Sequence, residues 1–118
     1  MNGEEQTLYT FFETPLFTKR LDESVPLEML YSIQADLMAD PKRWPVVRGL
    51  NGARKGRVAD PQSEQGKRGS FRYLYLYLEH RGQIYLLYLF AKSSQGNLSA
   101  AQKKEVAKIV AAIKRELE

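Results

Sequence analysis

Residues 71–78 alternate between tyrosine and leucine over their last six positions. Successive side chains of a β-strand point to opposite faces of the sheet, so this pattern predicts a strand with tyrosines on one face and leucines on the other. Residues 84–92 are apolar almost throughout, which is typical of a central strand. The polar residues 80–82 between them predict a hairpin turn. We therefore expect an antiparallel pair of strands in the second half of the chain.

Helix signals precede and follow these strands. Thr14 and the proline after it predict a helix start, because threonine can cap a helix and proline is favoured at the first helical position. A second helix begins at Pro26 and ends at Asp40, since the residue before a proline avoids the helical region. Ser99 and Gln102 have the spacing of a capping box. They predict a third, C-terminal helix.

Two further strands complete the expected fold. Residues 8–12 are aromatic and β-prone, and residues 53–59 have a spacing that suits a strand. The fold class is then α+β in the order β-α-α-β-β-β-α, an antiparallel sheet with an N-terminal helix pair on one face and a C-terminal helix. A chain of 118 residues that is 43% hydrophobic suits one compact domain. We expect residues 1–7 to be a flexible N-terminus and residues 8–118 to form a single domain.

Positive charge is concentrated between residues 48 and 72. This segment holds seven lysines or arginines against two acids, a balance of +5, whereas the whole chain carries +4. The seven cations are Arg48, Arg54, Lys55, Arg57, Lys67, Arg68 and Arg72. A polyanion is the natural partner for such a patch, and the backbone of RNA or DNA is the commonest one.

Composition excludes several kinds of chemistry. The chain has no cysteine, which rules out disulfides and thiolate metal sites. A single histidine, His80, rules out catalysis by paired histidines and a histidine-rich metal site. The first seven residues are polar and acidic, unlike a signal peptide, and no apolar run approaches the ~20 residues of a membrane span. We therefore expect a cytoplasmic protein with no metal, no cofactor and no membrane partner.

Four motifs occur in order along the chain. They are Glu13-Thr14-Pro15-Leu16-Phe17, Asn51-Gly52-Ala53-Arg54-Lys55-Gly56-Arg57-Val58-Ala59, Gly66-Lys67-Arg68-Gly69-Ser70-Phe71-Arg72, and Tyr85-Leu86-Leu87 running to Ala91-Lys92. Together they resemble the RelE/HigB-type toxins of type II toxin–antitoxin modules. The resemblance covers roughly residues 8–117, nearly the whole chain.

The resemblance implies a small RelE-like endoribonuclease, an mRNA interferase that cuts messenger RNA on the ribosome, inhibits translation and arrests growth. Such toxins work without a metal: the 2′-hydroxyl of the RNA attacks the adjacent phosphate. The implied partners are a cognate antitoxin protein, the ribosome and mRNA. Operator DNA is contacted only indirectly, through the antitoxin.

The resemblance also assigns catalytic roles to four residues. Lys55 and Arg57 match basic strand residues that hold the phosphate and help to deprotonate the hydroxyl. Arg72 matches an arginine that stabilises the transition state, and Lys92 matches the lysine that closes the following strand. Which residue is the general base or acid stays open. A solvated sheet face for Lys55 and Arg57, and a structural salt bridge for Arg72, are the alternatives.

RNA binding is expected of four further residues. We interpret Arg54, Lys67 and Arg68 as contacts to the RNA or ribosome backbone. Tyr75 is a candidate for stacking on a base, although a row of aromatic residues in a sheet is more often packing.

Two other functions stay open from sequence. The first is a non-catalytic toxin of the same fold that poisons another target, such as DNA gyrase. The second is an inactive RNA- or antitoxin-binding homologue, for which Ser93 and Ser94 after the strand-ending lysine are the sign. Cations at strand centres favour the nuclease, because a helix-mediated binder would not need them there.

Overall fold

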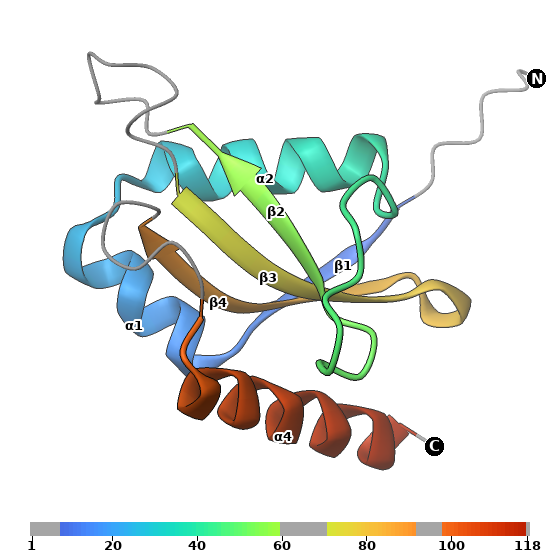
Figure 1. Cartoon of the computed structure of the whole chain (residues 1–118). Helices are drawn as coiled ribbons and strands as arrows, with labels where there is room; N and C mark the ends of the chain where they lie inside the picture. Colours follow the sequence, from blue (N-terminus) through green and yellow to red (C-terminus); the bar gives the residue numbers. More distant parts are fainter. Residues whose placement is uncertain (1–7, 60–70, 92–97, 118) are drawn as a thin grey trace, which may run out of the picture.

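The computed structural model describes residues 8–59, 71–91 and 98–117. Within these residues the chain forms one mixed sheet with helices on both faces (Figure 1). The expected order of elements, β-α-α-β-β-β-α, is confirmed. In chain order the elements are β1 (Thr10–Glu13), α1 (Pro15–Ser24), α2 (Leu27–Ala39), β2 (Arg54–Val58), β3 (Phe71–Leu78), the short 3-10 helix η2 (Glu79–Arg81), β4 (Gln83–Ala91) and α4 (Ala100–Leu117).

The sheet has the strand order β1-β4-β3-β2, which places β2 at one edge. The strands β2, β3 and β4 pair in antiparallel fashion, as the sequence predicts. The first strand differs from the expected all-antiparallel sheet, because β1 pairs with β4 in parallel. A register shift between Leu74 and Tyr75 marks an irregularity where β3 meets β4.

Each face of the sheet has its own apolar core, and the alternation along β3 separates the two. The tyrosine face is covered by α1 and α2, whereas the leucine face is covered by α4 (Figure 1). The first core includes Phe17, Met29, Ile33, Leu37, Tyr73, Tyr75, Ile84, Leu86 and Leu89. The second core includes Leu50, Leu74, Leu76, Leu78, Leu87, Phe90, Val106 and Val110.

The predicted helix caps are present. The Thr14 hydroxyl accepts a hydrogen bond from the Phe17 N–H at 3.2 Å, and Asp40 follows the last residue of α2. At α4 the Ser99 N–H donates to the Gln102 side-chain oxygen at 2.8 Å, and the Gln102 N–H donates to the Ser99 hydroxyl at 3.1 Å. These reciprocal bonds form a capping box.

Candidate functional site

The edge strand β2 divides its residues between the two faces of the sheet. Arg57 pairs with Arg72 of β3, so both side chains belong to the face covered by α4. Lys55 lies on the same face, opposite Leu74. Gly56 pairs with Tyr73 on the face covered by α1 and α2. The sheet register therefore brings cations from two neighbouring strands to one side of the molecule.

The side chains of Lys55, Arg57 and Arg72 line one shallow hollow of about 210 Å³. Trp44, Pro45 and Gly56 complete its lining. We call this site, lined by these six residues, the cationic hollow. Lys55 and Arg72 are half-buried, whereas Arg57 is exposed.

Electrostatics favour an anion in the cationic hollow. Burial, and then the positive charge of Arg57, lower the pKa of Arg72 below its ordinary value. A guanidinium nevertheless stays protonated at neutral pH, so two like charges are held near one another. A phosphate bound between them would be attracted by both charges and would accept hydrogen bonds from the guanidinium groups.

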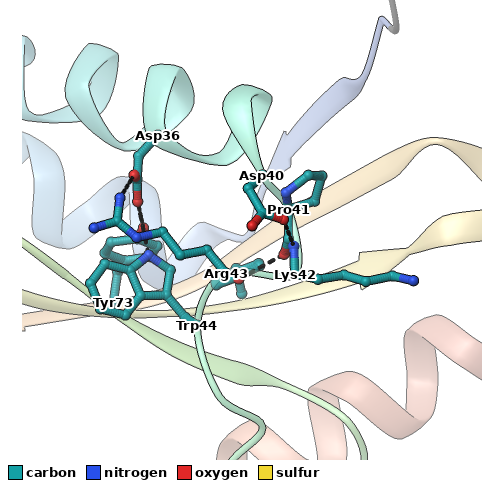
Figure 2. A network of polar contacts seen from close by, with 8 residues as sticks. Asp36, Asp40, Pro41, Lys42, Arg43, Trp44 and Tyr73 are labelled. Atoms are coloured by element: carbon teal, nitrogen blue, oxygen red, sulfur yellow. Dashed lines mark hydrogen bonds and ion pairs between the residues drawn. The ribbon is translucent and has the colours of Figure 1, made fainter.

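Trp44, a wall of the cationic hollow, is fixed by a polar network that sequence reasoning missed (Figure 2). Its indole N–H donates to one carboxylate oxygen of Asp36 at 2.8 Å, and the Tyr73 hydroxyl donates to the same oxygen at 3.2 Å. Arg43 forms an ion pair with the other oxygen, and its guanidinium lies 4.7 Å from the centre of the indole ring. We call Asp36, Arg43, Trp44 and Tyr73 the Asp36 network. It holds the tryptophan against the edge of the sheet.

Gly56 permits this packing. A Cβ atom at position 56 would lie 2.4 Å from Cζ of Tyr73 and 2.9 Å from Cδ1 of Trp44. Only glycine, here between Lys55 and Arg57, leaves room for both rings beside the strand. In the sequence, the glycine between Lys55 and Arg57 was the one sign that other side chains pack closely against the backbone of this strand.

The tyrosines of β3 serve packing. Tyr75 is fully buried, and its hydroxyl donates to the Pro41 carbonyl at 2.8 Å. The expectation that Tyr75 stacks on a base is therefore wrong, because its ring has no exposed face. Burial raises the pKa of Tyr75 to about 12. Burial and the nearby charge of Asp36 also raise the pKa of Tyr73, which keeps that phenol a hydrogen-bond donor.

Of the remaining site residues expected from the sequence, one makes structural hydrogen bonds and three lie outside the described residues. Arg54 lies on the tyrosine face, where its Nη1 donates to the backbone carbonyls of Trp44 at 2.7 Å and Lys42 at 3.2 Å. It holds the loop that carries the tryptophan. Lys67, Arg68 and Lys92, like the N-terminal residues 1–7, lie outside the described residues.

The described ranges hold neither a metal-binding cluster nor a membrane-spanning helix. No cluster of three or more His, Asp or Glu residues in residues 8–59, 71–91 and 98–117 has the arrangement of a metal site. Within the same residues, no helix combines the length and the hydropathy needed to cross a membrane.

No protein-family model matches the chain. Among solved structures, a mutant of the E. coli toxin RelE in the free state has a TM-score of 0.54 at 12% identity, covering 75% of this chain and 87% of that one. The isolated E. coli RelE toxin has a TM-score of 0.53 at 13% identity, covering 86% and 99%. A chain of the intact E. coli RelBE toxin–antitoxin complex has a TM-score of 0.53 at 13% identity, covering 70% and 95%.

At these low identities, the similarities to the three solved structures concern the fold alone. Together with the four-stranded sheet and the C-terminal helix, they show that the chain has the RelE-like fold of toxin–antitoxin toxins. The expectation of a RelE-like α+β fold is confirmed.

Proposed function

We propose that this chain is the toxin of a type II toxin–antitoxin module and a metal-independent endoribonuclease that cleaves mRNA on the ribosome. The observation that most supports this is the cationic hollow, where Lys55, Arg57 and Arg72 from two strands line one site of suitable charge. The RelE-like fold gives independent support for the toxin class.

The proposed reaction is a transfer within the RNA. The 2′-oxygen attacks the adjacent phosphorus, the bond from phosphorus to the 5′-oxygen breaks, and the products are a 2′,3′-cyclic phosphate and a free 5′-hydroxyl. The nucleophile belongs to the substrate, so no serine or cysteine of the protein is required. Negative charge grows on the phosphoryl oxygens in the transition state. Arg57 and Arg72 stabilise that charge, because fixed guanidinium groups can each bind two oxygens.

Proton transfer has one candidate among the described residues that line the hollow. The 2′-hydroxyl must lose a proton and the leaving 5′-oxygen must gain one. Guanidinium and indole groups keep their protons, whereas the amino group of a lysine can release and take up a proton. We assign Lys55 to this exchange, with Lys92 as the second lysine that the family resemblance places in the site.

The partners follow from the shape and charge of the site. A shallow open hollow does little to orient an RNA chain, so the ribosome supplies the in-line geometry of the message. A basic toxin needs neutralisation, and an acidic or amphipathic antitoxin segment would cover its charge. The similarity to a chain of the RelBE complex supports an antitoxin partner. Operator DNA is reached through the antitoxin.

Mapping of RNA ends after brief induction in cells tests the proposal. We expect growth arrest and new 5′-hydroxyl ends inside translated messages, and no such ends in a message whose start codon is removed. The double variant Arg57→Ala and Arg72→Ala should abolish cleavage and keep a native circular dichroism spectrum. The matched control is Lys19→Ala with Lys108→Ala, which removes the same charge from exposed positions on α1 and α4.

Two outcomes would contradict the nuclease, and a third would contradict the role of the cationic hollow in it. Toxicity with intact translated messages would contradict it, and persistent DNA damage in those cells would favour a toxin that poisons DNA gyrase. Salt-sensitive RNA binding without any product would favour an inactive homologue. Cleavage by the variant that lacks both arginines would show that the cationic hollow is not the site of the reaction.

A further inference from the structure

A second cavity adjoins the cationic hollow across the edge strand. It has a volume of about 270 Å³ and opens between α2, the loop after it and β2. Its lining includes Ser32, Asp36, Arg43, Trp44, Arg57 and Tyr73. We call it the Asp36 pocket. Trp44 and Arg57 line both cavities, so the two lie next to each other at the edge strand.

The Asp36 pocket offers a flat stacking surface. The guanidinium of Arg43 lies over the indole of Trp44, and both planar groups line the cavity (Figure 2). Buried Ile33 and Val58 add apolar wall. Unpaired RNA bases are bound in proteins by stacking on aromatic rings and on arginine planes. The shape and lining therefore suit a planar heterocycle.

The polar groups of the pocket indicate which groups the edge of that heterocycle should carry. A carboxylate has about four lone-pair sites. Arg43, Trp44 and Tyr73 each contact the Asp36 carboxylate, which fixes its orientation and leaves one lone-pair site for a further donor. Arg43 and Arg57 offset the charge of Asp36, so charge alone does not exclude a second phosphate from the pocket. The remaining site on the carboxylate nevertheless needs a donor, which an amino group supplies and an ionised phosphate does not. Carboxylates of proteins accept hydrogen bonds from base amino groups in this way.

We propose that the Asp36 pocket binds a base of the RNA beside the phosphate held in the cationic hollow, and that it selects bases with an exocyclic amino group. Arg57 stands between the two cavities and contacts the sugar–phosphate that joins them. Adenine, cytosine and guanine carry such an amino group, whereas uracil has none and offers only its N3–H, which is flanked by two carbonyl oxygens that the carboxylate repels. The identification of the ligand as RNA rests on the proposed function. The pocket would then contribute to the sequence preference of cleavage.

Binding of small ligands to the purified full chain tests this directly. The probes are the four nucleoside 3′-monophosphates and inorganic phosphate, and the readout is quenching of Trp44, the single tryptophan of the chain. We expect uridine 3′-monophosphate to bind more tightly than inorganic phosphate, because its base also stacks, and the adenosine, cytidine and guanosine compounds to bind at least about tenfold more tightly than the uridine compound. Equal affinities for the four nucleotides would contradict the proposed selection. Equal affinities for all five probes would overturn the proposal.

A substitution at the rim separates the pocket from the cationic hollow. Ser32 is exposed on α2 and lies outside the Asp36 network, so Ser32→Tyr fills the pocket without touching the core. It should reduce nucleotide binding to the level of inorganic phosphate and leave the binding of phosphate itself unchanged. The matched control is Ala35→Tyr, an exposed position of the same helix that does not line the pocket. Unchanged base selectivity in Ser32→Tyr would contradict the assignment, and the wild-type series decides by itself if the variant does not fold.

The outcomes distinguish this proposal from the nuclease. Cleavage of translated mRNA by a protein without base-selective binding would contradict the pocket alone. Base-selective binding that Ser32→Tyr removes, in a protein that cleaves nothing, would contradict the nuclease alone.

Discussion

Gly56 is the residue on which the geometry of the candidate site depends most closely. It separates Lys55 from Arg57, and the rings of Tyr73 and Trp44 occupy the space that a side chain would need. The tryptophan in turn lines both cavities. A single methyl group at this position would thus disturb a strand, the Asp36 network and the cationic hollow together.

Gly56→Ala should destabilise the protein by about 1–3 kcal/mol, the usual cost of overpacking. It should also shift the fluorescence of Trp44, because the added Cβ would lie 2.9 Å from the indole ring. Denaturant unfolding followed at this fluorophore measures both effects. Gly49→Ala is the control: a Cβ there meets nothing within 4 Å, although the φ of +85° is strained for alanine. An unchanged free energy of unfolding in Gly56→Ala, or an equal spectral shift in Gly49→Ala, would contradict this role.

At the residue scale, the sequence predicted the cations of the candidate site, but it did not predict the residues that surround them. Lys55, Arg57 and Arg72 lie on predicted strands, and strand parity was enough to group the first two on one face. Arg72 lies beside Lys55 and Arg57 because of the register between β2 and β3, and no local sequence pattern predicts that register. Asp36 and Trp44 were missed as site residues because their contact joins a helix to a loop. Tyr75 was misassigned because alternation tells which face a side chain takes and not whether helices cover that face.

At the scale of elements, Thr14 connects the first helix to the sheet by hydrogen bonds. Its hydroxyl caps α1 through the Phe17 N–H and donates to the Leu87 carbonyl at 2.8 Å. Its backbone N–H donates to the Leu86 carbonyl at 3.0 Å, which extends the pairing of β1 with β4. One buried threonine therefore sets both the start of the helix and its angle to the central strand.

Thr14→Ala should lower the free energy of unfolding by about 2 kcal/mol, because it removes a helix cap and leaves a buried carbonyl without its donor. Ser99→Ala, at the exposed cap of α4, should cost only about 1 kcal/mol. Urea unfolding of both variants measures the difference. Equal losses would show that the bond from Thr14 to the sheet adds nothing to the cap.

Local signals explain which elements could be predicted. The starts of α1 and α4 depend on hydrogen bonds within a few residues, so Thr14, Ser99 and Gln102 were sufficient to predict them. The strand at residues 71–78 follows from its own alternation. The parallel pairing of β1 with β4 could not be predicted in this way, because its partners lie far apart in the chain and no turn joins them.

At the scale of the whole molecule, one sheet supports two cores and exposes a charged edge. The helices α1 and α2 bury the tyrosine face and α4 buries the leucine face, which leaves β2 as the edge beside which both cavities open. The stability of the core and the geometry of the site are coupled, because Tyr75 bonds the loop that carries Trp44 and Tyr73 bonds Asp36, which holds the indole.

The buried tyrosines predict a loss of stability at high pH. The pKa of Tyr75 is raised to about 12, and that of Tyr73 is raised as well, whereas unfolded tyrosine titrates near pH 10. The folded state therefore keeps protons that the unfolded state releases above pH 10. The stabilisation is fully present below that pH and falls as pH rises toward 12, by at most about 1.4 kcal/mol per pH unit for each tyrosine.

Guanidinium unfolding between pH 8 and pH 11 measures this slope. Tyr75→Phe should flatten it, because phenylalanine has no proton to release. Tyr31→Phe is the control, since Tyr31 is 58% exposed on α2 and should leave the slope unchanged. A free energy of unfolding that stays constant to pH 11 would contradict the burial of both hydroxyl groups.

The most direct test of the account is a double-mutant cycle on the cleavage rate of ribosome-bound mRNA, with Arg57→Ala, Arg72→Ala and their combination. If both guanidinium groups act on one phosphate, each single variant should slow single-turnover cleavage at least about 100-fold, and the double variant should lose less than the product of the two effects. Rates within a few-fold of the wild type, or losses that multiply as for independent sites, would contradict a shared phosphate in the cationic hollow.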